Sequence, residues 1–556
     1  MASPVRAATK WFLFGVAAAL LSTPVAAGEK RTVCTITVNS ADEKEAFRRH
    51  LPAEKYQFVE LVERGRRDWL ASACSSGISC DILVISGHFD DGKEFFSDRV
   101  DAREFLPVSE LDRVSCSDSC PGLFSRLKEV HLFGCNTLNP GAQRSTTGEI
   151  VRGLVRDGIS PAEAERRAQA LGARHSESSR SRMERIFKDV PVIYGFSSVA
   201  PLGPSAGSAL DRYFQSAGTG EVGSGRASSR LLAQFASNSM TATRGMTATD
   251  AQAEVRRDVC QFSDDRLSGA QKLKFVHELM QRQSAEVRMF LDHVERYTTT
   301  IDEDQRRVPA FAAALQVIER DRAARERFLA FARDADQPQV RVRMLEVAST
   351  LGWLTPVQRQ EELVQMMREM LAHKSVGTAD VALACTLNTE GELDGVGDML
   401  IAAPGQVDDV AHAAVRACLG SAAGHARTLQ GLVSPAEADV DIAQAYLHQR
   451  PIADIDELRE VTAGIARMRG VGGQVRALDA LSRHRLSDPQ SLAALTQMFP
   501  AAESLSVQNA IAGILIRADY RALARPELVQ TLREHRRKSP YGADMIDALI
   551  RRLQLP

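Results

Sequence analysis

Short apolar runs alternate with amphipathic stretches over the first part of the chain, from Arg31 to about Gln215. Apolar runs bounded by turn residues predict buried strands, and the stretches between them, such as Ala41–His50 and Arg66–Cys74, predict helices. This alternation predicts an α/β domain with a parallel sheet and helices on both faces. The predicted strands are Thr32–Val38, Tyr56–Val62, Asp81–Ser86, Val130–Gly134 and Val190–Phe196.

From about Val255 to Pro556 the hydrophobic pattern is helical, with almost no strand signal. Proline or aspartate recurs where helices are expected to begin, as at Asp488-Pro489. The pattern resembles a degenerate HEAT-type α-solenoid, in which pairs of helices stack only on their neighbours. Because the repeats are divergent, an irregular α-helical domain is the alternative. One apolar helical face is formed by Val340, Met344, Leu345, Ala348 and Leu351.

A segment rich in glycine, serine, alanine and threonine, residues 217–254, joins the two patterned regions and predicts a linker or a surface loop. The predicted domains are therefore an α/β domain over 28–216 and a helical-repeat domain over 255–556. A helical insertion follows Cys135, and Ser160-Pro161 begins its second helix. The insertion is basic, which predicts a solvated surface, with a docking face as the alternative. Its arginines are Arg152, Arg156, Arg166, Arg167, Arg174, Arg180 and Arg182.

The first 27 residues predict a secretory signal peptide. Arg6 and Lys10 flank the start of an apolar stretch, and small residues lead to Ala27, the expected cleavage site. The apolar stretch is too short to span a membrane comfortably, and no second one follows. The sequence therefore predicts an exported protein, periplasmic or secreted, without stable membrane insertion.

The whole chain has the composition of a soluble globular protein, with 44% hydrophobic and 25% charged residues among 556. This length predicts more than one domain. Lysine and arginine total 69 against 71 aspartate and glutamate, a formal net charge of −2. A nucleic-acid or anionic-membrane partner would require a basic surplus, so we expect neither.

Export changes the interpretation of the nine cysteines, because disulfides persist outside the cytosol. An odd number leaves at least one thiol unpaired within the chain. Connectivity does not follow from sequence, and buried thiols that act as small apolar groups are the alternative. One arrangement, which leaves Cys135 free, pairs Cys74 with Cys80, Cys116 with Cys120, Cys385 with Cys418 and Cys34 with Cys260.

Two of the predicted strands are each followed by a residue that could act in catalysis. The run Asp81-Ile-Leu-Val-Ile-Ser-Gly ends at His88, and the run Glu129-Val-His-Leu-Phe-Gly ends at Cys135. In an open parallel sheet, reacting groups gather at the carboxyl ends of the strands. A histidine is a common means of converting a thiol into the nucleophilic thiolate. His131, four residues before Cys135, would lie about 13 Å back along its strand, so we interpret it as a core histidine.

The strand–Gly-His and strand–Gly-Cys-Asn layout resembles the caspase-like cysteine peptidases (clan CD), and the Phe-Gly-Cys-Asn-Thr turn most resembles their CHAT branch. The resemblance implies a His88/Cys135 dyad, with backbone amides of Gly87 or Phe89 and of Cys135 holding the oxyanion. The family has glycine after its histidine, whereas here Gly87 precedes it. The resemblance also implies that Ser197 and Ser198, after the next strand, line the substrate pocket. No cofactor is implied.

Three functions are thus open. The first is an endopeptidase that cleaves a protein or peptide substrate, with the helical repeats binding a protein substrate or partner. The second is an inactive caspase-like fold that serves as a binding scaffold. The third is a metal-assisted hydrolase that uses His88, Asp90 and Asp91, although Asp90 and Asp91 also fit a turn or an acidic substrate cleft that would favour a basic side chain. We assign no metal ligands.

Overall fold

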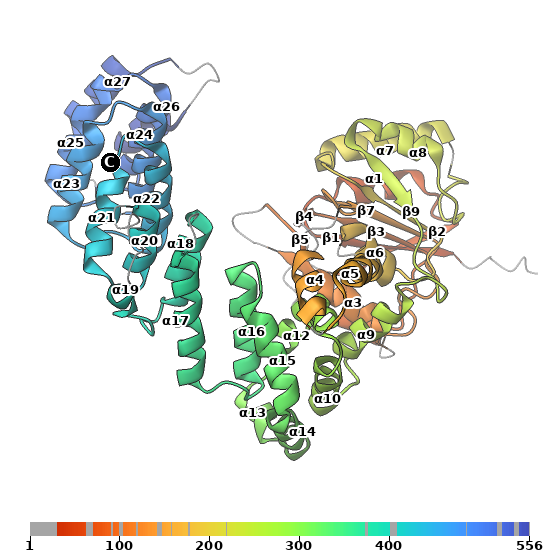
Figure 1. The fold of residues 1–556 in the computed structure, drawn as a ribbon. Coiled ribbons are helices and arrows are strands. Elements are labelled where there is room, and N and C mark those ends of the chain that lie inside the picture. Colours follow the sequence, from red (N-terminus) through yellow and green to blue (C-terminus); the bar gives the residue numbers. More distant parts are fainter. Residues whose placement is uncertain are drawn as a thin grey trace, which may run out of the picture. The chain divides into compact units, whose positions relative to one another are not determined.

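The computed structural model divides the chain into two compact units. Unit 1 comprises residues 1–145 and 173–267, and unit 2 comprises residues 146–172 and 268–556 (Figure 1). The predicted signal peptide lies outside the described residues. The structure describes residues 30–62, 70–90, 93–98, 104–117, 120–141, 147–156, 158–175, 178–217, 219–372, 376–400, 409–484, 486–519, 525–538 and 544–554.

Unit 1 is built on a mixed sheet whose strands, in the described part of the chain, lie in the order β2-β1-β3-β7-β8-β9. The first five of these are mutually parallel, and β9 pairs antiparallel with β8. Five strands lie where the apolar runs predicted them. The signal is strongest for β3, β7 and β8, because a strand buried on both faces is mostly apolar along its length. The strands are β1 (Arg31–Thr37), β2 (Tyr56–Glu60), β3 (Ile82–Ser86), β7 (Glu129–Phe133), β8 (Val192–Phe196) and β9 (Met240–Thr243).

A smaller antiparallel sheet follows β3 directly. It consists of β4 (His88–Asp90), β5 (Glu94–Phe96) and β6 (Phe105–Pro107), in the order β4-β5-β6. The buried side chains of Phe95 and Leu106 anchor it to the core. Its strands are too short to give a periodic signal, so the sequence did not predict them.

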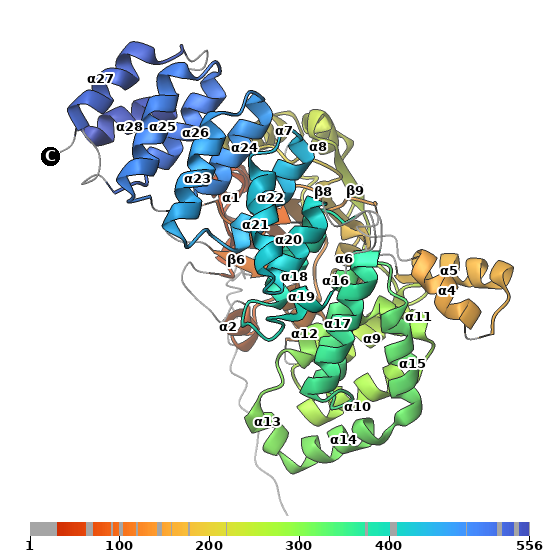
Figure 2. The same cartoon turned by 60° about the vertical axis from the view of Figure 1, so that its left-hand side comes forward.

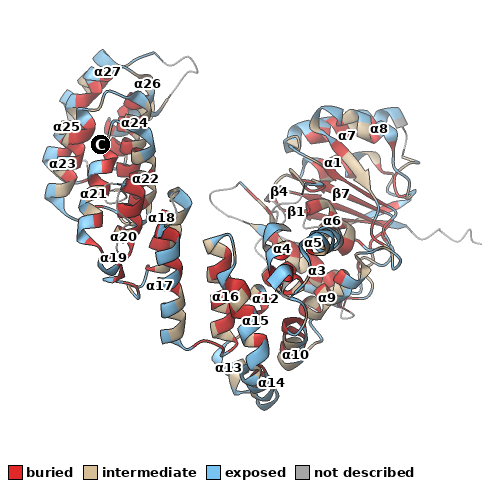
Figure 3. Ribbon diagram, viewed as in Figure 1, coloured by how far each residue is buried: buried red, intermediate tan, exposed pale blue. Residues whose placement is uncertain are grey.

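Helices cover both faces of the large sheet, as the α/β pattern predicted. Helices α1 (Asp42–His50) and α7 (Gly203–Ala217) pack with alternate residues of the strands on one face. Helices α3 (Val108–Cys116) and α6 (Ser179–Ile186) pack with the intervening residues on the other. The central strands β3, β7 and β8 are buried along their length (Figure 3). Unit 1 also contains α2 (Ala71–Ser75), α8 (Ser229–Gln234), the 3-10 turn Ala236–Asn238 and α9 (Ala253–Ser263).

The segment predicted as a linker, residues 217–254, belongs to the fold of unit 1 instead. It contains α8 and strand β9, whose residue Thr241 pairs with Gly195 of β8. Glycine and serine in this segment supply turns around short elements, which composition alone does not distinguish from a linker. The boundary between the units therefore falls near Leu267 rather than before Val255.

Four disulfides are present among the described residues, and Cys135 is the free cysteine there. Only one of the four, Cys385–Cys418, is a pairing that the sequence suggested. Short spacing along the chain was misleading, because the strands and helices bring distant cysteines together and direct near ones apart. The pairings Cys74–Cys80, Cys116–Cys120 and Cys34–Cys260 are replaced by Cys34–Cys80, Cys74–Cys120 and Cys116–Cys260.

Unit 2 is helical throughout its described residues. Its helices are α4 (Thr147–Arg156), α5 (Pro161–His175), α10 (Gly269–Met280), α11 (Ser284–Met289), α12 (Leu291–Thr298), α13 (Glu303–Arg307), α14 (Pro309–Arg320), α15 (Arg322–Arg333), α16 (Pro338–Thr350), α17 (Pro356–Ala372), α18 (Thr378–Leu387), α19 (Val396–Met399), α20 (Val410–Cys418), α21 (Ala422–Leu432), α22 (Glu437–Gln449), α23 (Ile455–Ala466), α24 (Val471–Leu481), α25 (Pro489–Ala501), α26 (Leu505–Leu515), α27 (Arg525–His535) and α28 (Met545–Leu553).

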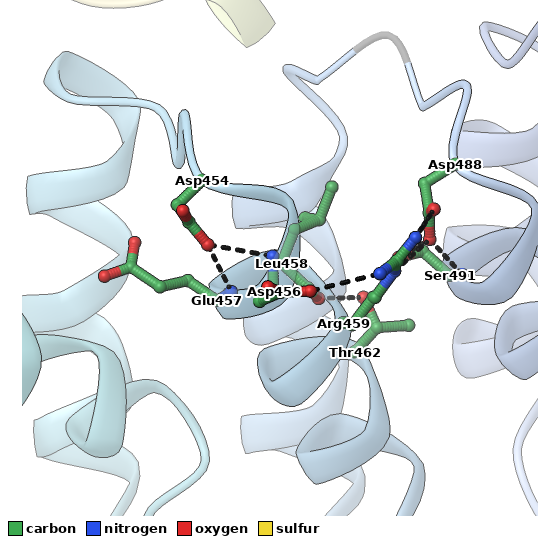
Figure 4. Close-up of polar contacts among 8 residues, drawn as sticks. All are labelled: Asp454, Asp456, Glu457, Leu458, Arg459, Thr462, Asp488 and Ser491. Atoms are coloured by element: carbon green, nitrogen blue, oxygen red, sulfur yellow. Dashed lines mark hydrogen bonds and ion pairs between the residues drawn. The ribbon is translucent and has the colours of Figure 1, made fainter.

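Alternate helices of the C-terminal part stack on one another. Helix α22 packs against α24, α24 against α26 and α26 against α28, while α23 packs against α25 and α25 against α27 (Figure 2). A polar contact accompanies this stacking between α23 and α25. Arg459 of α23 forms an ion pair at 2.7 Å with Asp488, the N-cap residue of α25 (Figure 4). Asp454 caps α23 itself by accepting hydrogen bonds from the amides of Asp456 and Glu457.

Helices α4 and α5 of the basic insertion pack within unit 2, whereas Arg180 and Arg182 lie on α6 of unit 1. Ile150, Leu154, Ala164 and Ala168 form a buried apolar cluster with residues of α11. Arg152 and Arg156, expected at a solvated surface, form ion pairs with Asp336 and Asp334 respectively, beyond the end of α15. Arg166 and Arg167 both pair with the half-buried Glu163. The insertion thus has one docked side and one solvated side.

No described helix combines the length and the apolarity that a membrane crossing requires.

Candidate active site

Strands β3 and β7 lie side by side and bring the two predicted site residues to one edge of the sheet. Their pairing ends with Ser86 opposite Phe133, and the Gly87 amide donates a hydrogen bond to the Phe133 carbonyl oxygen at 3.0 Å. His88 and Cys135 are each the second residue beyond this last pair. Both therefore leave the sheet at the carboxyl ends of neighbouring parallel strands, where reacting groups gather in this class of sheet.

The glycine before Cys135 is required by close backbone approach, and the glycine before His88 has little space for a side chain. A Cβ atom on Gly134 would lie 2.9 Å from the Gly87 carbonyl oxygen and 2.9 Å from the Phe89 Cβ. A Cβ on Gly87 would lie 3.1 Å from the Val38 Cβ. Real Cβ atoms are not found below about 3 Å from backbone atoms, so only glycine fits at position 134.

His88 begins strand β4, opposite Phe96 of β5, and its side chain is 30% exposed. The imidazole ring lies 5.4 Å from the Phe96 ring, centroid to centroid. Its Nε2 atom lies 3.5 Å from the Asp98 carboxylate, a charge contact, although it has no hydrogen-bond partner among the described residues. This contact places an acidic side chain beside the imidazole ring.

Cys135 lies in a tight turn after β7 and is partly buried. Asn136 has a φ of 58°, a left-handed conformation that asparagine tolerates. Its amide donates a hydrogen bond to the Ser198 carbonyl oxygen at 2.7 Å, and the Ala200 amide donates to the Cys135 sulfur at 3.3 Å. The loop after β8 thus contacts the Cys135 sulfur directly and holds the turn that carries it.

The oxyanion donors expected from the resemblance are only partly available. The Gly87 amide is already bonded to Phe133, so it is not free to hold an oxyanion, which corrects that assignment. Phe89 is buried within the β4–β5 ladder, opposite Phe95. The Cys135 amide has no acceptor among the described residues and lies next to the sulfur. The Cys135 amide is therefore available as a hydrogen-bond donor, as an oxyanion hole requires.

The predicted pocket residues lie in different surroundings. Ser197 is bonded through its amide and hydroxyl to the Ser239 carbonyl, whereas Ser198 is exposed and its carbonyl fixes the Cys135 turn. Asp90 ends β4 opposite Glu94, on the strand that begins at His88. Asp91 lies outside the described residues.

Two carboxylates at this edge were missed from the sequence. Asp98 follows β5, and β5 itself gave no strand signal. Glu43 belongs to the acidic first turn of α1, a pattern that by itself indicates only a favourable helix dipole. Glu43 is nevertheless 3% exposed, and its burial raises the pKa of its carboxyl to about 7.

His131 is a core residue, as predicted. It is 2% exposed and stacks on Tyr194 with 4.8 Å between ring centroids, while its Nε2 lies 3.4 Å from the Glu129 carboxylate. Burial raises the pKa of Tyr194, so this phenol stays neutral and serves packing. For the metal alternative, the described residues contain no group of three or more histidine, cysteine, aspartate or glutamate side chains placed to hold an ion.

Comparisons with protein-family models, with curated proteins and with solved structures find no match to this chain.

Proposed function

We propose that this protein is an exported cysteine endopeptidase of caspase-like type in which Cys135 is the nucleophile and His88 the acid–base residue. The observation that carries the proposal is the register of β3 and β7. Ser86 opposes Phe133, and His88 and Cys135 follow at equal distances along the chain. The free thiol among four disulfides adds support, since eight cysteines are paired and the one at the strand end is not.

In the proposed reaction, His88 accepts the proton of the Cys135 thiol, and the thiolate attacks the carbonyl carbon of a peptide bond. The Cys135 amide stabilises the oxyanion of the tetrahedral intermediate, a contribution worth about 3 kcal/mol in other enzymes. The C–N bond then breaks, and His88 returns the proton to the leaving amine. Water hydrolyses the thioester to a carboxylic acid and regenerates the thiol. Asp98 is placed to stabilise the imidazolium between these steps.

Cys135→Ala and His88→Ala variants of the exported protein test the dyad. We expect each to lose cleavage of a peptide library while retaining the thermal unfolding temperature of the unmodified protein. His50→Ala is a suitable control, because His50 lies in the same unit, with its Nε2 atom 2.9 Å from the Asp211 carboxylate. Wild-type turnover in both dyad variants would show that another group performs the reaction.

A second candidate function is an inactive caspase-like scaffold, and one observation favours it. The Gly87 amide already donates its hydrogen bond to the Phe133 carbonyl oxygen, so one of the expected oxyanion donors is not available. Iodoacetamide distinguishes the two functions when its rate with Cys135 is measured in the wild type and in His88→Asn. A peptidase requires a reactive thiolate that depends on His88, whereas a scaffold predicts slow reaction and no difference between the two proteins.

We also propose that unit 2 binds the protein substrate or a protein partner as a HEAT-like solenoid. The alternate stacking of α22, α24 and α26 supports this, because stacked helix pairs expose extended surfaces suited to polypeptide recognition. Binding by a linked unit raises the effective concentration of a target near the active site. Charge reversals on unit 2 should therefore weaken cleavage of a folded protein but not of a short peptide.

A further inference from the structure

The small antiparallel sheet carries three aromatic side chains in a row that begins at the proposed acid–base residue. His88 of β4 lies opposite Phe96 of β5, and Phe96 in turn lies opposite Phe105 of β6. Residues that lie directly opposite each other on antiparallel strands direct their side chains to the same face of the sheet. The imidazole and the Phe96 ring are 5.4 Å apart, centroid to centroid. We call His88, Phe96 and Phe105 the aromatic row.

The aromatic row lies on the face of the small sheet that is turned away from the core. The alternating residues Phe89, Phe95 and Leu106 are 5%, 0% and 0% exposed and belong to the apolar core of unit 1. Because successive side chains of a strand point to opposite faces, the row occupies the other face. Phe105 is 45% exposed, and the side chain of His88 is 30% exposed. This face therefore offers aromatic surface that a bound side chain would remove from water.

The chemistry of the proposed reaction determines which part of a substrate lies closest to the row. His88 returns a proton to the nitrogen of the leaving amine, so that nitrogen must come within about 3 Å of the imidazole. The nitrogen belongs to the first residue after the cleaved bond. Phe96 lies beside the imidazole, and Phe105 lies one strand farther, about 4.8 Å away along the row. The side chain of this first residue thus begins within reach of the row, whereas the acyl part of the substrate is joined to Cys135.

We infer that the aromatic row is the subsite for the first residue after the cleaved bond, and that this residue has an aromatic or large aliphatic side chain. The inference rests on the proposed peptidase function and names its substrate class. A phenyl ring carries no charge and no hydrogen-bonding atom, so Phe96 and Phe105 select a side chain by the apolar surface that it covers. A small side chain would leave both rings in water.

Cleavage of a mixed peptide library by the full-length mature protein tests this inference. The products are sequenced by mass spectrometry, and the residue at each new amino terminus is compared with its frequency in the library. We expect aromatic residues, leucine, isoleucine and methionine to be enriched about tenfold at the new amino termini. This is the size of effect expected when part of a large apolar side chain is removed from water.

Two substitutions of Phe105 and one control assign the enrichment to the row. Phe105→Ser should reduce it to about twofold or less, whereas Phe105→Leu should retain it, because leucine restores apolar surface at the same position. Val317→Ser is the matched control. Val317 is 56% exposed on α14 of unit 2, so this variant also replaces an exposed apolar side chain by serine and should leave the enrichment unchanged.

The outcomes separate the subsite from the peptidase. Cleavage by the wild type without enrichment after the cut would overturn the subsite and leave the peptidase intact, and this result depends on the folding of no variant. Enrichment that persists undiminished in Phe105→Ser would also overturn the assignment to the row. If the wild type cleaves no peptide of the library, the proposed peptidase function is wrong and this inference fails with it.

Discussion

Gly134 lies so close to Gly87 that a Cβ at position 134 would be 2.9 Å from the Gly87 carbonyl oxygen. The two glycines end neighbouring strands, and each is followed by a residue of the proposed dyad. Their contact explains the recurrence of glycine in the two motifs, because it lets the backbones stay in contact as they leave the sheet.

Gly134→Ala should therefore disturb the site. We expect a loss of about 1–3 kcal/mol in the free energy of unfolding, since the neighbouring backbone must move to admit the methyl group. Alkylation of Cys135 should also slow. Gly220→Ala is the control, because a Cβ there has no neighbour within 4 Å. Unchanged stability and reactivity in Gly134→Ala would contradict the close approach.

Stability should depend on pH through Glu43. Burial raises the pKa of the Glu43 carboxyl in the folded protein from 4.5 to about 7, so folding favours the neutral form. The stability that this preference contributes is fully present below the unfolded pKa. That contribution is lost as pH rises through about 7. The loss is on the order of 3 kcal/mol by linkage. Glu43→Gln should match the wild type in denaturant unfolding at low pH and exceed it in stability at pH values above about 7.

The disulfides should stabilise their own units. Removal of Cys34–Cys80 by a double serine substitution should lower the stability of unit 1 by about 2–5 kcal/mol, and removal of Cys385–Cys418 should do the same to unit 2. Scanning calorimetry should show that each double variant lowers a different unfolding transition. A single transition that shifts equally in both variants would indicate that the two units unfold together.

Asp488 should stabilise unit 2 more than Asp454, although both are helix N-caps. Asp488 accepts a hydrogen bond from the Ser491 amide and also pairs with Arg459, whereas Asp454 bonds only to amides among its described contacts (Figure 4). Loss of a cap costs about 1 kcal/mol, so Asp454→Ala should cost that much and Asp488→Ala more.

The Asp488 contribution should vanish in acid. The hydrogen bond from Arg459, followed by that from the Ser491 amide, lowers the pKa of the Asp488 carboxyl well below its ordinary value. Stabilisation is therefore complete above the unfolded value of about 3.9 and is lost as pH falls below it. Urea unfolding of Asp488→Ala and of the wild type should converge at low pH. If the difference in free energy of unfolding stayed constant with pH, the charge of the Asp488 side chain would not contribute to stability.

The unit boundaries do not follow the order of the elements along the chain. The insertion helices α4 and α5 follow Cys135 in sequence, yet their apolar residues Ile150 and Leu154 pack with Ala285 of α11 in unit 2. No local pattern specifies which distant helix an amphipathic face will meet. Strand β9 was missed for a related reason, since Met240–Thr243 becomes a strand by pairing with β8 rather than through its own propensity.

The sequence by itself determined the elements with strong local signals. Apolar runs such as Ile82–Ser86 and Glu129–Phe133 are buried on both faces and so are recognisable as parallel strands. It also determined the adjacency of His88 and Cys135 to strand ends, because each directly follows such a run and a glycine. These features depend on residues near one another in the chain.

Only the tertiary structure decided the relationships that span long separations. It paired Cys116 with Cys260, directed the Gly87 amide to Phe133 and placed Asp98 beside His88. It also buried Glu43, which resembles an ordinary surface acid at a helix start in the sequence. Burial, charge proximity and the occupation of a hydrogen-bond donor depend on which elements meet in space, and the hydrophobic pattern of one element does not contain that information.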